Sequence, residues 1–469
     1  MPEIAFLPAT RQAELVRTKE LSPVELVETY LQRIEKLDPE INSFVTVIPE
    51  QALEAARRAE RDVAEGGELP PFHGVPTAIK DLTPTAGIRT TFSSRAFADH
   101  VPKVDAGVVR RMKEAGFILV GKTNAPEFGS VPVTESVLNG ACRNPWDTSV
   151  TPGGSSGGAA AAIAAGLLPV AQGSDGGGSI RIPASCCGLF GIKPARGRVS
   201  LAPHFGYQWA GFVTDGPIAR TVADGAALLD VMSGYETGDP FWAAEPERPF
   251  ADEVDRSPGR LRIAATTSSP TGIAPDDDVS AAVRDAAELL ASLGHDVEEA
   301  APDWADPELA AHVVKIAQTN PVYFGVTDPS LLEPLNAAWL EAALATPSTE
   351  YLRSIIAIHA LCRRIVAFWD TYDIVLTPTL GIAPPPVGWM FEEDDPWDQL
   401  RRSALIVPFT SVFNATGQPA VSIPLFRNDA GIPIGVQLAG RPADEATLIR
   451  LAAQLEQARP WADDRPPLS

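Results

Sequence analysis

The order of apolar and polar residues divides the beginning of the chain into helices and a strand. Residues 11–37 carry apolar residues at helical spacing, and Ser22-Pro-Val-Glu25 is a capping box with proline at the first helical position. Pro39 is expected to end this helical region, because proline interrupts a helix interior. Residues 44–48 are β-branched or apolar, as in a strand, and residues 50–65 return to an amphipathic helical pattern.

From residue 75 onward, short β-branched or apolar runs alternate with alanine-rich helical segments. Such alternation indicates an α/β fold in which a largely buried sheet lies between helices. The expected strands are residues 75–79, 117–120, 261–265, 296–299 and 373–377. The expected helices are residues 105–115, the segment after Gly158, 222–232, 278–293 and most of 307–370.

The chain shows no internal repeat or low-complexity stretch, so one domain over residues 1–469 is expected. It divides into an N-terminal helical region (1–70), a core segment (71–235), a connector (236–260), a helical insert (261–402) and a C-terminal part of the core (403–469). Within the insert, residues 381–398 predict a long loop with tryptophan and acidic residues, and loops of that length often cover a binding site as a lid.

Composition narrows the classes of function. The chain is 45% hydrophobic and 21% charged, as in soluble globular proteins, and its net charge of −22 disfavours nucleic-acid binding. No secretory signal is evident, and the apolar stretch 159–171 is too short to span a bilayer, so a cytoplasmic protein with no membrane partner is expected. The four cysteines and six histidines lack the spacing of zinc or redox sites, so we expect no metal and no cofactor.

Two glycine-rich runs, each with a serine at its centre, carry the strongest chemical signal. Pro152-Gly-Gly-Ser-Ser-Gly-Gly158 contains Ser155, and Ser174-Asp-Gly-Gly-Gly-Ser-Ile-Arg-Ile-Pro183 contains Ser179. Glycines permit unusual dihedral angles and expose backbone N–H groups, which a strained nucleophile and an oxyanion hole both need. Flexible linkers are the alternative, but both runs lead directly into apolar segments.

A serine hydroxyl must lose its proton to a base as it attacks a carbonyl, and no histidine has an obvious claim to that role. Lys80 follows the apolar run 75–79, and burial there would lower its pKa and make it a base. Ser155 would lie between Lys80 and Ser179 and relay the proton, since a hydroxyl both accepts and donates. A surface lysine paired with Asp81 is the alternative. The backbone N–H groups of Gly176, Gly177 and Gly178 would face the developing oxyanion.

With Gly74-Val-Pro-Thr-Ala-Ile-Lys-Asp81 and Gly121-Lys-Thr-Asn-Ala-Pro-Glu127, these runs resemble the amidase signature family of Ser-Ser-Lys hydrolases. The resemblance covers nearly the whole chain. It implies the amidase signature fold, in which helices cover both faces of a central mixed, twisted sheet. It also implies that Ser179 is the acylated nucleophile, Ser155 the bridging serine on a cis peptide bond, and Lys80 the final base.

The same resemblance implies supporting roles for other residues. Asp175 and Arg181 look like a pair that fixes the nucleophile loop beside Ser174. The backbone near Phe128 and Gly129 is expected to hold the substrate amide.

Two positions depart from the commonest form of the motif. Ser174 stands where Thr is usual, and Gly176, where Thr or Ile is usual, resembles the branch that includes hydrolases of nylon-type cyclic amides. Ile182 stands where the glutaminase subunits of tRNA-dependent amidotransferases usually carry Gln, which suits a polar substrate. These residues favour a free-standing amidase, and they leave such a subunit and a non-catalytic binding protein of the same fold as alternatives.

Aromatic residues in the expected insert loops indicate a small apolar or aromatic amide as the substrate, with Trp209 as a substrate contact. Esters and carbamates are accessible to the same acyl-transfer chemistry. A monomer or homodimer is expected. The aromatic residues are Phe205, Tyr207, Trp209, Tyr323, Phe324, Trp389, Phe391 and Trp397.

Overall fold

A mixed sheet lies at the centre of the computed structural model, which describes residues 4–306 and 308–469. Its strands follow the order β10-β9-β11-β13-β12-β7-β8-β6. β9 runs parallel to β10 and β11, and the other neighbours are antiparallel. The strands are β6 (Val170–Asp175), β7 (Phe190–Lys193), β8 (Thr214–Ala219), β9 (Arg262–Ala265), β10 (Asp296–Glu299), β11 (Ile374–Pro378), β12 (Ala420–Arg427) and β13 (Pro433–Ala439).

A second sheet of three strands lies beside the edge strand β6. It has the order β1 (Phe44–Val47), β3 (Ile118–Thr123), β2 (Pro76–Lys80). β2 contacts β6 through side chains, since the Thr77 hydroxyl donates to the Val170 carbonyl at 3.0 Å and the Lys80 N–H donates to Gln172 Oε1 at 3.0 Å. This contact brings the end of β2 to the end of β6. A short hairpin, β4 (Glu135–Ser136) and β5 (Gly140–Ala141), stands apart.

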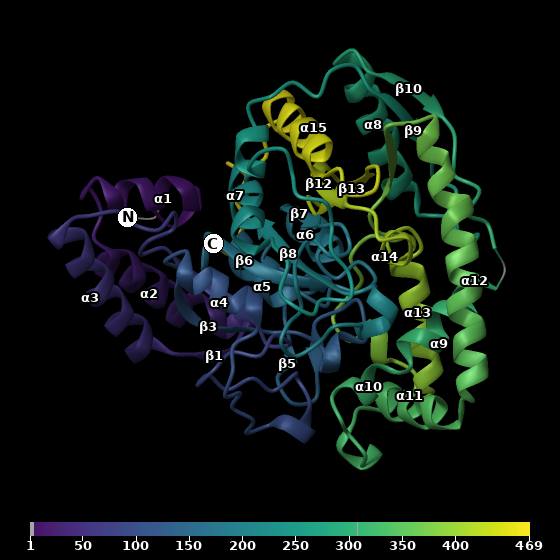
Figure 1. Ribbon diagram of the computed structural model, residues 1–469, viewed down its shortest axis with the longest axis horizontal. Helices are drawn as coiled ribbons and strands as arrows, with labels where there is room; N and C mark the ends of the chain where they lie inside the picture. The colour runs from purple at the N-terminus through teal and green to yellow at the C-terminus, as the bar shows by residue number, and fades with distance from the viewer. Residues whose placement is uncertain (1–3, 307) are drawn as a thin grey trace.

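Helices cover both faces of the central sheet and both ends of the molecule (Figure 1). α1 (Ala9–Arg17), α2 (Pro23–Ile41) and α3 (Pro49–Glu65) gather at one end of the long axis, whereas α9 (Leu309–Ala317), α10 (Asn320–Tyr323), α11 (Pro334–Ala345) and α12 (Ser348–Val366) gather at the other. The remaining helices are α4 (Gly107–Glu114), α5 (Gly157–Ala164), α6 (Arg181–Cys187), α7 (Val222–Met232), α8 (Asp277–Ser292), α13 (Pro396–Ile406), α14 (Ser411–Thr416) and α15 (Glu445–Ala458).

The α5 and α6 helices occupy the interior because their side chains are small or apolar. Every residue of α5, Gly-Gly-Ala-Ala-Ala-Ala-Ile-Ala, is buried, and so is every residue of α6. Alanine and glycine let a helix approach sheets closely, so α5 fits where a helix with larger side chains would not. Both helices start at the glycine-rich runs, which therefore lie at the centre of the molecule. Within the described ranges, no helix is long and apolar enough to cross a membrane.

The α/β prediction is confirmed, as is the Ser22 cap, whose hydroxyl accepts from the N–H groups of Val24 and Glu25. The prediction that Pro39 ends its helix is wrong, because α2 continues to Ile41. Asn42 ends it instead with a left-handed φ of 55°, a conformation that asparagine tolerates better than most residues. The expected loop 381–398 is shorter than predicted, since α13 begins at Pro396.

Candidate active site

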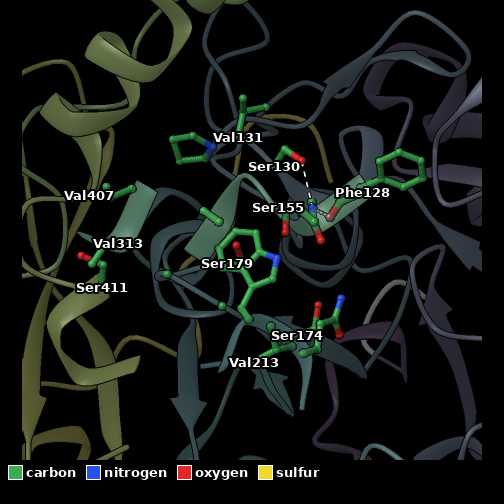
Figure 2. A pocket seen from close by; sticks show the side chains of 18 of the residues that line it. Phe128, Ser130, Val131, Ser155, Ser174, Ser179, Val213, Val313, Val407 and Ser411 are labelled. Carbon is green, nitrogen blue, oxygen red and sulfur yellow. Dashed lines mark hydrogen bonds between the residues drawn. The ribbon is translucent and has the colours of Figure 1, made fainter. Parts of the chain in front are cut away.

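A cavity of about 550 Å³ is lined by the segments that follow β2, β3 and β6 and by the helices α9, α11 and α13. Ser155, Ser174 and Ser179 line it together with apolar side chains, among them Val131, Val213, Val313 and Val407 (Figure 2). Both glycine-rich runs therefore face one hollow, and a small organic molecule fits in it.

Lys80 is the last residue of β2, and its side chain is completely buried. Nζ donates to Ser155 Oγ at 2.7 Å and to Ser174 Oγ at 3.0 Å. Burial lowers the pKa of Lys80 to about 7, although the carboxyl groups of Asp215 and Asp175 oppose that shift. A large fraction of Lys80 is therefore an uncharged amine near neutral pH, as a general base must be.

Ser155 lies in the turn that precedes α5, and the peptide bond between Gly154 and Ser155 is cis. Glycines surround it because the chain segments approach closely. A Cβ atom on Gly154 would lie 2.5 Å from the Val133 carbonyl oxygen, and one on Gly129 would lie 3.0 Å from Ser155 Oγ. Larger residues at these two positions would displace the hydroxyl that Lys80 contacts.

Ser179 lies in the turn between β6 and α6 and is half-buried at the cavity wall. The Ser156 N–H donates to the Ser179 carbonyl oxygen at 3.1 Å, which joins the two glycine-rich runs. Ser155 and Ser179, predicted from two separate motifs, thus line the same cavity (Figure 2). Lys80, predicted from a third motif, is buried beside it and contacts Ser155.

Backbone N–H groups that could face an oxyanion are present at this turn. Among the described residues, no protein acceptor lies within hydrogen-bonding geometry of the N–H groups of Gly176, Gly177 and Ser179. The Gly178 N–H differs from expectation, because it donates to Asp175 Oδ1 at 2.7 Å. The Ser179 N–H was not anticipated. An aspartate three residues before Gly178 is the sequence signal that the side chain would occupy that N–H.

Asp175 and Arg181 form a completely buried ion pair at 2.8 Å. Burial raises the pKa of the Asp175 carboxyl, but the Arg181 guanidinium more than reverses this and holds that pKa well below its usual range. Arg181 also donates to the Thr410 carbonyl and to the side chains of Gln437 and Asn414. The turn that carries Ser179, which the family resemblance identifies as the nucleophile turn, is therefore tied to α14 and β13 by charge-assisted bonds.

Phe128 and Gly129 line the cavity, but their backbone N–H groups are already paired. The Phe128 N–H donates to the Phe92 carbonyl at 2.9 Å, and the Gly129 N–H donates to the Pro126 carbonyl at 3.0 Å. Asn320, which sequence reasoning missed, is buried at the cavity wall and donates to the Phe128 carbonyl at 3.0 Å. Only the carbonyl groups of this segment have lone pairs left for a substrate amide.

The aromatic prediction is partly wrong. Phe205, Trp209 and Phe324 line the cavity, and Trp339 does so without having been predicted. The other five predicted aromatic residues are absent from the cavity lining among the described residues. Trp389 and Phe391 pack against the hydrophobic core instead, and Trp397 is 37% exposed. The residues that do not line it are Tyr207, Tyr323, Trp389, Phe391 and Trp397.

Metal-binding side chains do not cluster in the part of the chain that the structure describes. There, no group of three or more His, Cys, Asp or Glu side chains could hold a metal ion. The lining does contain hydroxyl groups at Ser155, Ser174 and Ser179 and a carboxyl group at Asp215.

Comparison with known proteins places the chain in a family. The sequence model of the family described as Amidase matches residues 25–449. A putative amidase of Synechocystis sp. is 41% identical over 97% of this chain and 89% of that protein. The 6-aminohexanoate-cyclic-dimer hydrolase of Paenarthrobacter ureafaciens is 38% identical over 98% of this chain and 96% of that protein.

The comparison of structures leads to the same family as the comparison of sequences. A solved structure of a 6-aminohexanoate cyclic dimer hydrolase complexed with substrate superposes with a TM-score of 0.92 and 36% identity, over 99% of both chains. A sequence match of this length and a fold match of this closeness agree with each other. The chain therefore belongs to the amidase signature family, whose members are hydrolases that act on amide bonds.

Proposed function

We propose that this protein hydrolyses the C–N bond of small, largely apolar or aromatic amides through an acyl-enzyme on Ser179. The observation that carries the proposal is the contact between Lys80 Nζ and Ser155 Oγ at the wall of an apolar cavity that Ser179 also lines. Ester and carbamate bonds are side substrates, since acyl transfer to serine needs only an activated carbonyl and a leaving group.

The proposed reaction begins with an uncharged Lys80. The amine takes the Ser155 proton while Ser155 takes the Ser179 proton, and Ser179 Oγ forms a bond with the substrate carbonyl carbon. The N–H groups of Gly176, Gly177 and Ser179 stabilise the negative oxygen of the tetrahedral intermediate. The proton returns through Ser155 to the leaving nitrogen as the C–N bond breaks. Water then attacks the acyl-enzyme by the same route and releases the acid.

The cavity lining supports an apolar substrate. Ile182, Trp209 and Val213 line it near the nucleophile turn. Of the charged residues among the described lining, Asp215 is buried, and Arg401 is largely exposed and pairs with Asp395 at 2.8 Å. A glutamine substrate carries two charges that need partners, so this lining disfavours the glutaminase alternative.

A substrate panel tests the proposal. Purified protein is assayed on an aryl amide such as a nitroanilide, a short aliphatic amide, glutamine, an ester and an aryl carbamate, and kcat/KM is compared. We expect the highest value for an apolar aryl amide and none above background for glutamine. Ser179→Ala is the control, because it removes the nucleophile and leaves the fold intact. Turnover that survives Ser179→Ala, or a wild-type protein that is inert on the whole panel, contradicts the proposal.

The proposal includes the state of assembly. We propose that the enzyme works as a monomer or homodimer without a cofactor, a nucleic acid or a partner chain. Light scattering coupled to gel filtration distinguishes the two states. Activity that requires a second polypeptide would favour the amidotransferase alternative.

A further inference from the structure

Asp215 lies beside the proposed base without a role in the mechanism above. It sits on β8 directly opposite Ser174 of β6 in the antiparallel pair. Residues directly opposite in such a pair project on the same face, and so does Gln172, two positions before Ser174. Ser174 Oγ accepts from Lys80 Nζ at 3.0 Å, so this face is the one that Lys80 contacts.

Gln172 links the two residues more directly. Its Oε1 accepts the backbone N–H of Lys80 at 3.0 Å, and its Nε2 donates to Asp215 Oδ1 at 3.0 Å. Asp215 is 5% exposed and lines the cavity. Within residues 4–306 and 308–469, its second oxygen accepts no hydrogen bond from the protein. A carboxyl group at the cavity wall is thus held in place through one oxygen, while the other oxygen has no protein donor among the described residues.

We propose that Asp215 is a positioning residue that stabilises the ammonium form of Lys80 during acyl transfer. This inference rests on the proposed function, because it requires Lys80 to be the base. When the Ser179 O–H bond breaks and the proton arrives at Lys80 through Ser155, a positive charge appears on Nζ in a buried site. The Asp215 carboxylate offsets that positive charge. The charge on Nζ disappears when the proton passes to the leaving nitrogen.

The other charged groups near Asp215 already have partners of their own, so Lys80 is the cation with which Asp215 interacts. Burial raises the pKa of Asp215 to about 7, and Lys80 opposes that shift. On β6, Asp175 is neutralised by Arg181, and on β7, Lys193 donates to the Pro194 carbonyl. Two helices also pack against β8. The sequence of α5 contains no titratable residue, and on α7 the acids Asp224 and Asp230 accept backbone N–H groups of residues 9, 10, 250 and 251.

The test is the pH dependence of Ser179 labelling by a fluorophosphonate probe in Asp215→Asn. Labelling needs the nucleophile and its base but no substrate recognition. The labelling rate falls at low pH as Lys80 becomes protonated, and this part of the pH profile is its acid limb. Removing the carboxylate lowers the pKa of Lys80, so the acid limb is expected to move to lower pH by about one unit or more. The plateau rate is expected to fall about tenfold, and KM for a neutral anilide to stay within about twofold. Asp215→Glu is expected to keep the limb near its wild-type position.

Different results would contradict the proposed function and the role of Asp215. Absence of Ser179 labelling in the wild-type protein overturns the proposed function. Normal labelling with the same acid limb in wild type and Asp215→Asn overturns the role of Asp215. Asp224→Asn is the matched control, since it removes another buried carboxylate that lies away from the cavity, and it is expected to lower stability without moving the limb.

A second measurement does not depend on the folding of Asp215→Asn. Carboxyl ¹³C NMR follows the titration of Asp215 in wild type and in Lys80→Met. Because Lys80 favours the charged carboxylate, its removal is expected to move the Asp215 titration to higher pH. An Asp215 titration that is the same in both proteins overturns the inference.

Discussion

Lys80 Nζ lies 2.7 Å from Ser155 Oγ, and neither side chain is more than 2% exposed. An amine in such a place pays a desolvation cost only when it is charged, so burial favours the uncharged form. The same contact gives the amine a hydroxyl from which it can take a proton. Burial and geometry therefore support, by separate physical routes, the proposal that Lys80 is the base.

The activity of this enzyme should rise with pH and reach half its maximum near pH 7. Burial lowers the pKa of Lys80 to about 7, and only the uncharged amine accepts a proton, so activity is lost as pH falls through that value. The measurement is kcat/KM for a nitroanilide between about pH 5 and 9. Lys80→Met should reduce kcat by at least about a thousandfold at every pH. A Lys80→Met enzyme that keeps the acid limb would show that another group is the base.

Gly176 and Trp209 are expected to be coupled in substrate selection. A Cβ atom added to Gly176 would lie 3.2 Å from Val213 Cγ2 and 3.4 Å from the Trp209 ring. Gly176→Thr adds further atoms and forces the indole to move. Overpacking of this kind costs about 1–3 kcal/mol, so kcat/KM for an aryl amide should fall about tenfold or more. Steady-state kinetics on an aryl and a short aliphatic amide measure the effect.

The double variant Gly176→Thr/Trp209→Leu is the critical control for this pair. Leucine leaves room for the threonine, so the double variant should recover part of the aryl amide activity that Gly176→Thr loses. Trp209→Leu alone shows what the indole contributes. Strictly additive losses in the two single variants would contradict the coupling.

Local patterns predicted much of the fold and two of the serines that line the cavity. The period of apolar residues located α3, α7 and α8 to within a residue or two, because a helix must bury one face. The glycine-rich runs located Ser155 and Ser179, since close backbone approach leaves a local mark on the sequence. Each of these features depends on residues near one another in the chain.

Contacts between distant residues that no sequence motif marks could not be predicted. Asp215 meets Ser174 only because β8 pairs with β6, and Asn320 reaches Phe128 only because α10 lies against the cavity. The aromatic residues show the same limit. Composition cannot decide whether Trp389 faces a cavity or the core, and it packs against the core. Pairing and packing of distant segments set these positions.

Replacing Arg181 by methionine should destabilise the protein by about 3–5 kcal/mol, because Asp175 would remain buried without its partner. Denaturant unfolding measures the loss. The low pKa of Asp175 also predicts how stability depends on pH. The Asp175 carboxylate stabilises the folded protein fully above its ordinary pKa of 3.8, and this stabilisation is lost as pH falls toward the lower pKa of the folded state. Arg181→Met should therefore narrow the stability difference between neutral and acid pH.

The buried pair of Arg198 and Glu445 provides a matched control for Arg181. Nε and Oε1 lie 3.0 Å apart, both side chains are almost completely buried, and neither residue lines the cavity. Arg198→Met should lose similar stability but keep kcat in the folded fraction, whereas Arg181→Met should lose both because it releases the nucleophile turn. Equal kcat in the two folded variants would show that the Asp175–Arg181 pair does not position Ser179.

Ile182→Gln should weaken the enzyme without converting it to a glutaminase. Ile182 is 1% exposed and packs in a buried hydrophobic cluster at the cavity wall, so placing a glutamine amide there is expected to cost about 1–3 kcal/mol. We expect kcat/KM for an aryl amide to fall about tenfold and glutamine hydrolysis to stay at background. Ile182→Leu, which conserves volume, should cost far less. Substantial glutamine turnover by Ile182→Gln would show that this one position sets the choice between the two substrate classes, because no other charged or amide group would have been added to the site.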